Sequence, residues 1–312
     1  MSRSVPSASP RTPFHWLANQ PYLLLTLTSL FWAGNAIVGR MAAGHIPPVT
    51  MAFIRWVGAF LIVLPFAWPH LRKDWSAIKG RLWLMVLLSL TGIGAFNTLQ
   101  YLALERTTAL NVLLLQSSMP LFVATWSLVL LGARLTLAQM AGIATSLVGV
   151  LVILMKGDLL VLAAFALNVG DLLFIAALII FGFYTTMSSQ SPKIAPASFL
   201  AFTFGVGALS IVPLVGWEIA VRPPMEVTAG TLLSLLYLML FPSIVAYLCY
   251  NRGVALIGGN RAAPFIHLVP VFGSAMAVLL LGERAEWFHG LGYVLVLCGI
   301  AVAARKPKTA AI

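Results

Sequence analysis

The chain carries ten continuous apolar runs, each roughly 20 residues long, which is the length a helix needs to cross the hydrocarbon core of a bilayer. Membrane strands would instead alternate over about ten residues. With 61% hydrophobic and 9% charged residues, the chain has more apolar side chain than one soluble core can hide, since globular domains carry about 25% charged residues. We therefore predict an all-α membrane protein with ten transmembrane helices, at approximately 22–42, 49–69, 81–103, 108–131, 138–155, 171–190, 197–217, 230–251, 261–281 and 289–304.

A second feature is an internal duplication with an offset of 150 residues. The segment LLGARLTLAQMAG at 130–142 is echoed by LLGERAEWFHGLG at 280–292. Chance supplies leucine and valine matches in apolar sequence, but hardly the recurring proline, arginine and glycines. The 35 positions from 120 to 154 hold ten residues that recur, namely Pro120/Pro270, Phe122/Phe272, Leu130/Leu280, Leu131/Leu281, Gly132/Gly282, Arg134/Arg284, Gly142/Gly292, Leu147/Leu297, Gly149/Gly299 and Val152/Val302.

The duplicated unit holds five spans, and an odd number of crossings reverses the direction in which the second copy enters the membrane. The predicted fold is therefore two inverted five-helix repeats. Inverted repeats are the architecture of many secondary transporters, whose substrate site lies near the midplane where the halves meet. The predicted organisation is a flexible cytoplasmic tail (1–21), a first repeat (22–156), a linker (157–170), a second repeat (171–304) and a cytoplasmic tail (305–312).

The net charge of +11 indicates orientation rather than a nucleic-acid partner, because the basic residues are unequally divided between the two sides. Five lie in odd-numbered loops: Arg40, Arg106, Lys156, Arg222 and Arg284. Thirteen lie in even-numbered loops and the tails: Arg3, Arg11, Arg72, Lys73, Lys79, Arg81, Arg134, Lys193, Arg252, Arg261, Arg305, Lys306 and Lys308. We expect a multi-pass protein of the bacterial inner membrane with both termini cytoplasmic, a monomer surrounded by lipid bilayer.

The sequence offers no signal for a cofactor, a metal site or an enzyme. Cys249 and Cys298 lie inside apolar runs, which disfavours thiolate metal sites and disulfides. The sequence has no GxxxxGK[ST] phosphate loop, no HExxH motif and no clustered nucleophile and base. All eight acidic residues lie in loops or near span ends: Asp74, Glu105, Asp158, Asp171, Glu218, Glu226, Glu283 and Glu286. Carriers coupled to protons or selective for organic cations usually need a carboxylate within the membrane.

Polar and aromatic residues at matched places in both halves are the main candidates for substrate binding. They are Asn97, Gln100 and Tyr101 in the third span and, 150 residues later, Tyr247, Tyr250 and Asn251 in the eighth. The spacing i, i+3, i+4 places each trio on one helical face. Such trios would line a cavity between the halves, or else lie at the headgroup belt and bind neighbouring helices.

Other spans supply further candidates. Trp32 and Asn35 in the first span share a helical face, and Tyr184 falls within one position of the counterpart of Asn35. In the fourth and ninth spans, Gln116 and His267 precede the matched Pro120 and Pro270, which we interpret as kinks or hinges. His267 is either a buried histidine satisfied by its neighbours or a proton carrier.

Arg55 lies inside the second span, where a lipid-facing charge would be costly. It would bind a substrate carboxylate, or else serve a structural role by capping helix carbonyls or extending toward the membrane surface. Its counterpart at an offset of 148 is Thr203, so the charge is not shared by the two halves.

The segments FWAGNAIVGR (31–40) and FIRWVGAFLIVLP (53–65), with the paired LLGAR and LLGER phrases, resemble the EamA domains of the drug/metabolite transporter superfamily. The resemblance runs from about 22 to 304. It implies ten helices and a central cavity lined mainly by the first four helices of each half, and the family includes an exporter of aromatic amino acids. The chain departs from the family phrase at Ala133, where glutamate is usual.

These observations predict a secondary transporter that exports small-molecule metabolites by uncoupled alternating access. The favoured substrates are amino acids, and among these the aromatic ones. The absence of a mid-membrane carboxylate favours neutral or zwitterionic solutes. The alternatives are a proton-coupled antiporter for drugs or metabolites, and a flippase for a lipid-linked substrate.

Overall fold

The structure, a computed structural model, describes residues 16–42, 44–107, 112, 115–116, 118–155, 158, 168–281 and 286–304. Within these residues the chain is helical and contains no strand. The elements in chain order are α2 (Pro21–Ala42), α3 (Pro48–Gly80), α4 (Leu82–Ser89), the π-helix η1 (Leu90–Ala95), α5 (Phe96–Leu104), α7 (Met119–Leu131), α8 (Leu137–Leu154), α10 (Val169–Ser188), α11 (Pro196–Val221), α12 (Ala229–Leu238), the π-helix η2 (Met239–Val245), α13 (Ala246–Ile257), α14 (Gly259–Ala262), the 3-10 helix η3 (Ala263–His267), α15 (Leu268–Leu281) and α16 (Trp287–Ala303).

These elements confirm the predicted all-α membrane fold. Six continuous helical segments are long and apolar enough to cross a bilayer, and shorter apolar helices, α7, α8 and α16 among them, accompany these. The third, eighth and ninth predicted spans are each built from three consecutive elements: α4–η1–α5, α12–η2–α13 and α14–η3–α15. The early part of the fourth span, before residue 118, lies mostly outside the described residues.

The second span is longer than hydropathy predicts, because α3 continues through Pro65 and Pro69 to Gly80. Its last three turns are amphipathic rather than apolar, with Ile78 buried and several basic side chains exposed. Two basic side chains lie over indole rings one helical turn earlier. Arg72 Cζ is 4.9 Å from the ring centroid of Trp68, and Lys79 Nζ is 5.6 Å from that of Trp75. Hydropathy therefore marks where the chain leaves the membrane, and not where the helix ends.

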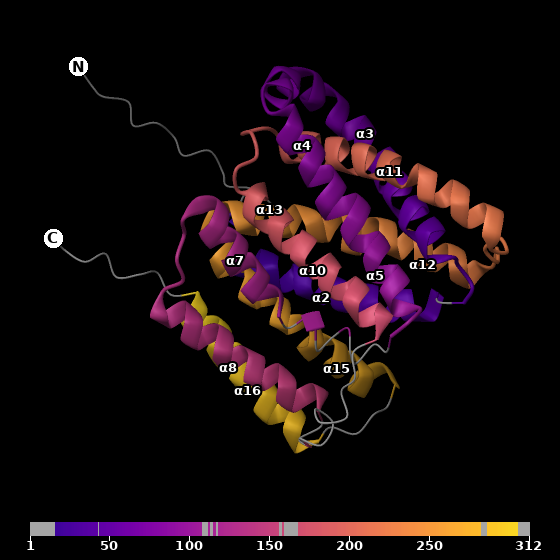
Figure 1. The fold of residues 1–312 in the computed structure, drawn as a ribbon. Coiled ribbons are helices and arrows are strands. Elements are labelled where there is room, and N and C mark those ends of the chain that lie inside the picture. Colours follow the sequence, from indigo (N-terminus) through magenta and orange to yellow (C-terminus); the bar gives the residue numbers. More distant parts are fainter. Residues whose placement is uncertain are drawn as a thin grey trace, which may run out of the picture.

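The helix contacts come in pairs that a twofold rotation would interchange, with each helix of one repeat replaced by its counterpart in the other. α8 runs beside α16 at one edge of the molecule and α3 beside α11 at another, and each pair joins equivalent spans (Figure 1). Likewise α2 packs on α13, while its counterpart α10 packs on α5. Contacts of α2 with α15 are mirrored by contacts of α10 with α7. This pattern is what a twofold relation between the repeats requires.

The duplicated glycines of α8 and α16 make the contact between these two helices. A Cβ on Gly299 would stand 2.5 Å from the carbonyl oxygen of Gly142, and one on Gly149 would stand 2.8 Å from that of Gly292. Because Gly142 faces Gly299 and Gly149 faces Gly292, the helices are antiparallel. Their backbones approach as closely as small-residue interfaces in membranes permit. The repeated glycines therefore serve packing across the pseudo-twofold axis.

Two carboxylates cap the helices of the α3–α11 pair reciprocally. Glu218, fully buried near the end of α11, accepts from the backbone nitrogens of Val49 at 3.1 Å and Thr50 at 2.6 Å. Asp74, near the end of α3, accepts from the backbone nitrogen of Ala195 at 2.9 Å and from Ser198 at 2.7 Å. Both helices begin with proline, and a carboxylate at such a terminus satisfies free N–H groups and the helix dipole.

Bonds between loops join segments on the same predicted side of the membrane. On the even-numbered side, Arg81 donates to the carbonyl of Gln190 at 2.8 Å and Arg261 to that of Ala304 at 2.7 Å. On the odd-numbered side the bonds are the bidentate Arg222–Glu105 pair at 2.5 and 2.9 Å, Thr107 to Asp171 at 2.5 Å and His45 to Glu226 at 2.7 Å. Each bond fits a chain that crosses the membrane ten times.

The glycine contact yields a stability prediction. Replacing Gly299 by alanine should lower the unfolding midpoint of the purified protein in detergent by several degrees, because the new methyl group meets the backbone of Gly142 and Ser146. Overpacking of this kind costs about 1–3 kcal/mol. Differential scanning fluorimetry measures the change.

Gly290→Ala in the same helix is the matched control. A Cβ there meets nothing within 4 Å, so the variant should unfold at the wild-type temperature or slightly above it, given the better helix propensity of alanine. Equal effects of the two substitutions would contradict close packing of α8 on α16.

Candidate functional site

The two matched polar trios each follow a π-helical segment, at the same place in both repeats. η1 covers 90–95 and η2 covers 239–245, so the segments coincide within one residue after the shift of 150. A π-helical turn inserts an extra residue into an α-helix and loosens its hydrogen-bond ladder, which is why such turns recur at functional sites. Pro242 has no backbone N–H and so favours this irregularity in η2.

The carbonyl oxygens of these π-helical segments bind side chains from elsewhere in the bundle. In η1, the Gly92 oxygen accepts from the Tyr247 hydroxyl at 2.7 Å. In η2, the equivalent Pro242 oxygen accepts from Trp32 Nε1 at 3.2 Å and from Arg55 Nη2 at 3.1 Å. Both irregular turns therefore turn main-chain acceptors toward the space between the halves.

Arg55 is the centre of a buried network that joins the two repeats. Its side chain is about 1% exposed, and its guanidinium also stacks on Trp56 at 4.6 Å. Asn97 extends the network by donating to the Tyr247 hydroxyl at 3.3 Å. All the acceptors that the described residues give Arg55 are electrically neutral: Ser243 Oγ at 2.5 Å, Asn35 Oδ1 at 3.1 Å, Asn97 Oδ1 at 3.1 Å, the Tyr101 hydroxyl at 2.7 Å and the Pro242 oxygen at 3.1 Å.

A cavity of about 350 Å³ lies beside this network, within the size range of small-molecule sites. Its wall is mostly apolar and comes from both repeats. Met41, the penultimate residue of α2 and 70% exposed, lines it, so the cavity wall extends to the odd-numbered end of α2. The described lining residues are Trp32, Ala33, Asn35, Ile37, Met41, Arg55, Phe96, Asn97, Gln100, Leu104, Val112, Gln116, Met119, Tyr247, Ile266, Val269 and Gly273.

Seven residues singled out from the sequence meet in this wall: Trp32, Asn35, Arg55, Asn97, Gln100, Gln116 and Tyr247. Tyr101 lies behind them, because its hydroxyl is held by Arg55 and donates to Asn35 at 3.2 Å.

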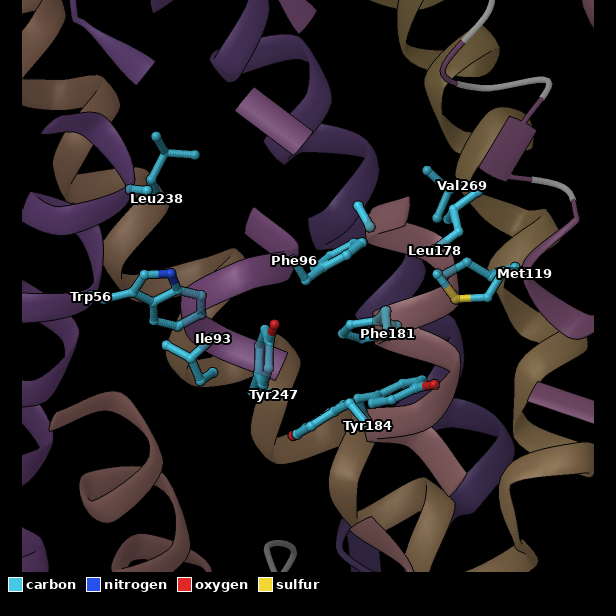
Figure 2. Close-up of a cluster of buried hydrophobic side chains, with 14 of the residues drawn as sticks. Trp56, Ile93, Phe96, Met119, Leu178, Phe181, Tyr184, Leu238, Tyr247 and Val269 are labelled. Atoms are coloured by element: carbon cyan, nitrogen blue, oxygen red, sulfur yellow. The ribbon is translucent and has the colours of Figure 1, made fainter. Parts of the chain in front are cut away.

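Tyr184 and Tyr250, which the sequence predicts as cavity residues, lie on the even-numbered side of the cavity and do not line it. The Tyr184 hydroxyl donates to Asn251 Oδ1 at 2.8 Å, and the Tyr250 and Thr185 hydroxyls are hydrogen-bonded to each other at 2.7 Å. Figure 2 shows Tyr184 and Tyr247 beside Phe181 in an aromatic cluster, with ring centroids 5.3 Å apart for Phe181–Tyr184 and 6.1 Å for Tyr184–Tyr247. This cluster closes the cavity on that side.

His267 also lies away from the cavity wall. It is fully buried where η3 meets α8, and its Nδ1 lies 2.6 Å from the Ser146 hydroxyl. The two prolines predicted as kinks or hinges, Pro120 and Pro270, both lie near the start of a helix. Pro120 is the second residue of α7, and Pro270 is the third residue of α15, which directly follows the 3-10 helix η3. Proline is tolerated in the first turn because the N–H it lacks would have no partner there.

Sequence reasoning missed the contributions of Pro242, Ser243 and Phe96. A proline inside the eighth apolar run was a usable signal for an irregular turn, and its match to Gly92 at an offset of 150 strengthens that signal. The ring of Phe96 lies against that of Phe181, with centroids 4.3 Å apart and planes tilted by 37°, and nothing in the sequence distinguishes Phe96 from the other phenylalanines of the chain.

The one-sided cavity predicts unequal chemical accessibility. In a chain carrying Cys249→Ser and Cys298→Ser, a cysteine in place of Ile37 should react rapidly with a membrane-impermeant thiosulfonate, because Ile37 lines the cavity. A cysteine in place of Thr185, fully buried on the closed side, should react far more slowly. Equal initial labelling rates would contradict the closure.

Comparison with known proteins agrees with this architecture. A model of the EamA-like transporter family matches residues 19–155 and 168–305. An uncharacterized transporter of Archaeoglobus fulgidus is 28% identical, covering 92% of this chain and 98% of its own. A probable amino-acid metabolite efflux pump of Salmonella typhimurium is also 28% identical, over 89% and 93%. A crystal structure that is 19% identical superposes with a TM-score of 0.70 over 92% of this chain and 96% of its own. The chain belongs to the EamA-like transporter family.

Proposed function

We propose that this protein exports amino acids, aromatic ones above all, by uncoupled alternating access. The observation that carries the proposal is the cavity between the repeats, whose wall combines aromatic rings with amides and whose described residues include no carboxylate. Ring faces suit an aromatic side chain, and Asn97, Gln100 and Gln116 supply donors and acceptors for a zwitterion. Relatives named as a probable amino-acid metabolite efflux pump and a probable terminal-alkyne amino-acid exporter support this substrate class.

In this proposal, Trp32 is the side chain that makes the transporter prefer aromatic substrates. Its indole lines the cavity, and its Nε1 is anchored to Pro242 in the opposite repeat. Tyr247 meets it edge to face, at 6.0 Å between ring centroids, and Tyr250 supports it at 5.0 Å. A substrate ring that stacks on such a fixed aromatic gains about 0.5–1.5 kcal/mol beyond area burial.

Orientation and mechanism complete the proposal. The excess of basic residues in the even-numbered loops supports a cytoplasmic location for these loops in an inner-membrane protein, and in that orientation the cavity described here faces outward. The aromatic cluster around Tyr184 and Tyr250 closes the cytoplasmic side, and a cytoplasm-facing state opens there after the repeats exchange conformations. The proposed unit is a monomer, because described residues of one chain line the cavity from both repeats.

Transport of phenylalanine or tryptophan into liposomes containing the purified protein tests the proposal. Uptake should exceed that of protein-free vesicles and respond little to an imposed pH gradient. Trp32→Leu should reduce uptake of these solutes two- to tenfold, roughly the energy of one aromatic pair. Trp217→Leu, at a position 57% exposed on the outside of α11, should leave uptake unchanged.

Three outcomes would contradict parts of this proposal. Uptake at the rate of empty vesicles removes the substrate assignment. Accumulation driven by a pH gradient and abolished by His267→Ala shows proton coupling instead. Movement of a fluorescent lipid between leaflets, without amino acid uptake, identifies a flippase.

A further inference from the structure

Arg55 brings a positive charge into the membrane interior with neutral hydrogen-bond partners only, among the described residues. A guanidinium keeps its charge in proteins, and a charge at this depth is costly unless it is paired. Neutral oxygens solvate it but do not neutralise it. Among the described residues, the site therefore gives the charge hydrogen-bond acceptors but no counter-charge.

The second repeat shows that packing at this position does not require a charge. The counterpart of Arg55 at an offset of 148 is Thr203, which is buried and donates to the carbonyls of Phe199 and Leu200 in its own helix at 2.8 and 3.3 Å. Both positions lie on the paired helices α3 and α11. Arg55 is among the described residues that line the cavity and Thr203 is not, so the charge is found only in the copy that faces the cavity.

The geometry points to a ligand carboxylate as the missing partner, an inference that rests on the proposed function. We propose that Arg55 binds the substrate's carboxylate and so sets the substrate class as aromatic monocarboxylates, for which the α-amino group is dispensable. Arg55 is the one charged side chain among the described residues of the wall, so this wall offers no anion to an ammonium group. A cationic amine would meet the same positive charge unfavourably.

The network has room for such an exchange. Asn35 and Asn97 both line the cavity and both offer their Oδ1 to the same Nη1, so a carboxylate entering from the cavity replaces one or both amide oxygens. Nη2 carries two N–H groups, and the described residues provide it one acceptor, Pro242. A charge-assisted, bidentate bond to a carboxylate is roughly twice as strong as the neutral bonds it replaces.

The wild-type protein alone is sufficient for the decisive test. Phenylalanine, 3-phenylpropionate and 2-phenylethylamine share a ring and a chain and differ in their charged groups. Thermal stabilisation of the purified protein in detergent reports binding to the folded state. Phenylalanine and 3-phenylpropionate should stabilise it at similar concentrations, whereas the amine should need at least about tenfold more. Stabilisation by the amine equal to that by the acid, or by neither compound, overturns the inference.

Variants of Arg55 then identify the residue responsible. Arg55→Gln should abolish the preference for the acid over the amine, while Arg55→Lys should retain the preference with weaker binding, because lysine keeps the charge and loses the planar fork. Arg222→Gln removes an equal charge outside the cavity wall and should leave the ratio unchanged. A preference that survives in folded Arg55→Gln protein refutes the assignment.

The binding measurements, combined with the liposome transport assay, distinguish failure of this inference from failure of the proposed function. Transport of phenylalanine with equal binding of acid and amine leaves the exporter proposal intact and removes the role of Arg55. Binding of the acid in preference to the amine, without transport of phenylalanine, supports the carboxylate site and removes the amino acid exporter.

Discussion

The membrane interior provides no water to satisfy a polar group, and this constraint governs the central architecture of the protein. Two π-helical turns loosen the hydrogen-bond ladders of the third and eighth spans, and side chains from other spans take up the exposed carbonyls. Tyr247 bonds Gly92, while Trp32 and Arg55 bond Pro242. Because each of these bonds connects different spans, the irregular turns hold the two repeats together around the cavity as well as shaping its wall.

The duplication conserves the scaffold and leaves the chemistry free to differ. Glycines 142, 149, 292 and 299 pack α8 on α16 symmetrically, and both π-helical turns recur at the offset of 150. At the cavity, by contrast, Asn97 faces its counterpart Tyr247, and Arg55 corresponds to Thr203. The backbone geometry is thus retained in both copies, whereas polar side chains of the cavity wall differ between them.

The sequence predicts the number of crossings, the inversion and much of the cavity, because hydropathy and repeat matching report properties of whole spans. It fails where the answer depends on the rotation and depth of one side chain. Gln100 and Tyr250 are repeat counterparts on equivalent helices, yet Gln100 lines the cavity and Tyr250 lies beneath it, bonded to Thr185. A transporter that is open on one side makes equivalent positions inequivalent, and this asymmetry belongs to the conformation rather than to the sequence.

The position of Arg55 also bears on how a substrate would affect the opening of the cavity. The guanidinium contacts Asn97, which bonds Tyr247, and through Tyr247 the chain of bonds reaches Gly92 in η1; directly, it contacts Pro242 and Ser243 in η2. A ligand carboxylate that replaces the Asn97 oxygen at the guanidinium would therefore change a network of bonds that reaches both π-helical turns. A ligand can shift a conformational equilibrium only by its differential affinity for the two states, and a guanidinium bonded directly to η2 and linked to η1 through Asn97 and Tyr247 provides a physical source for that difference.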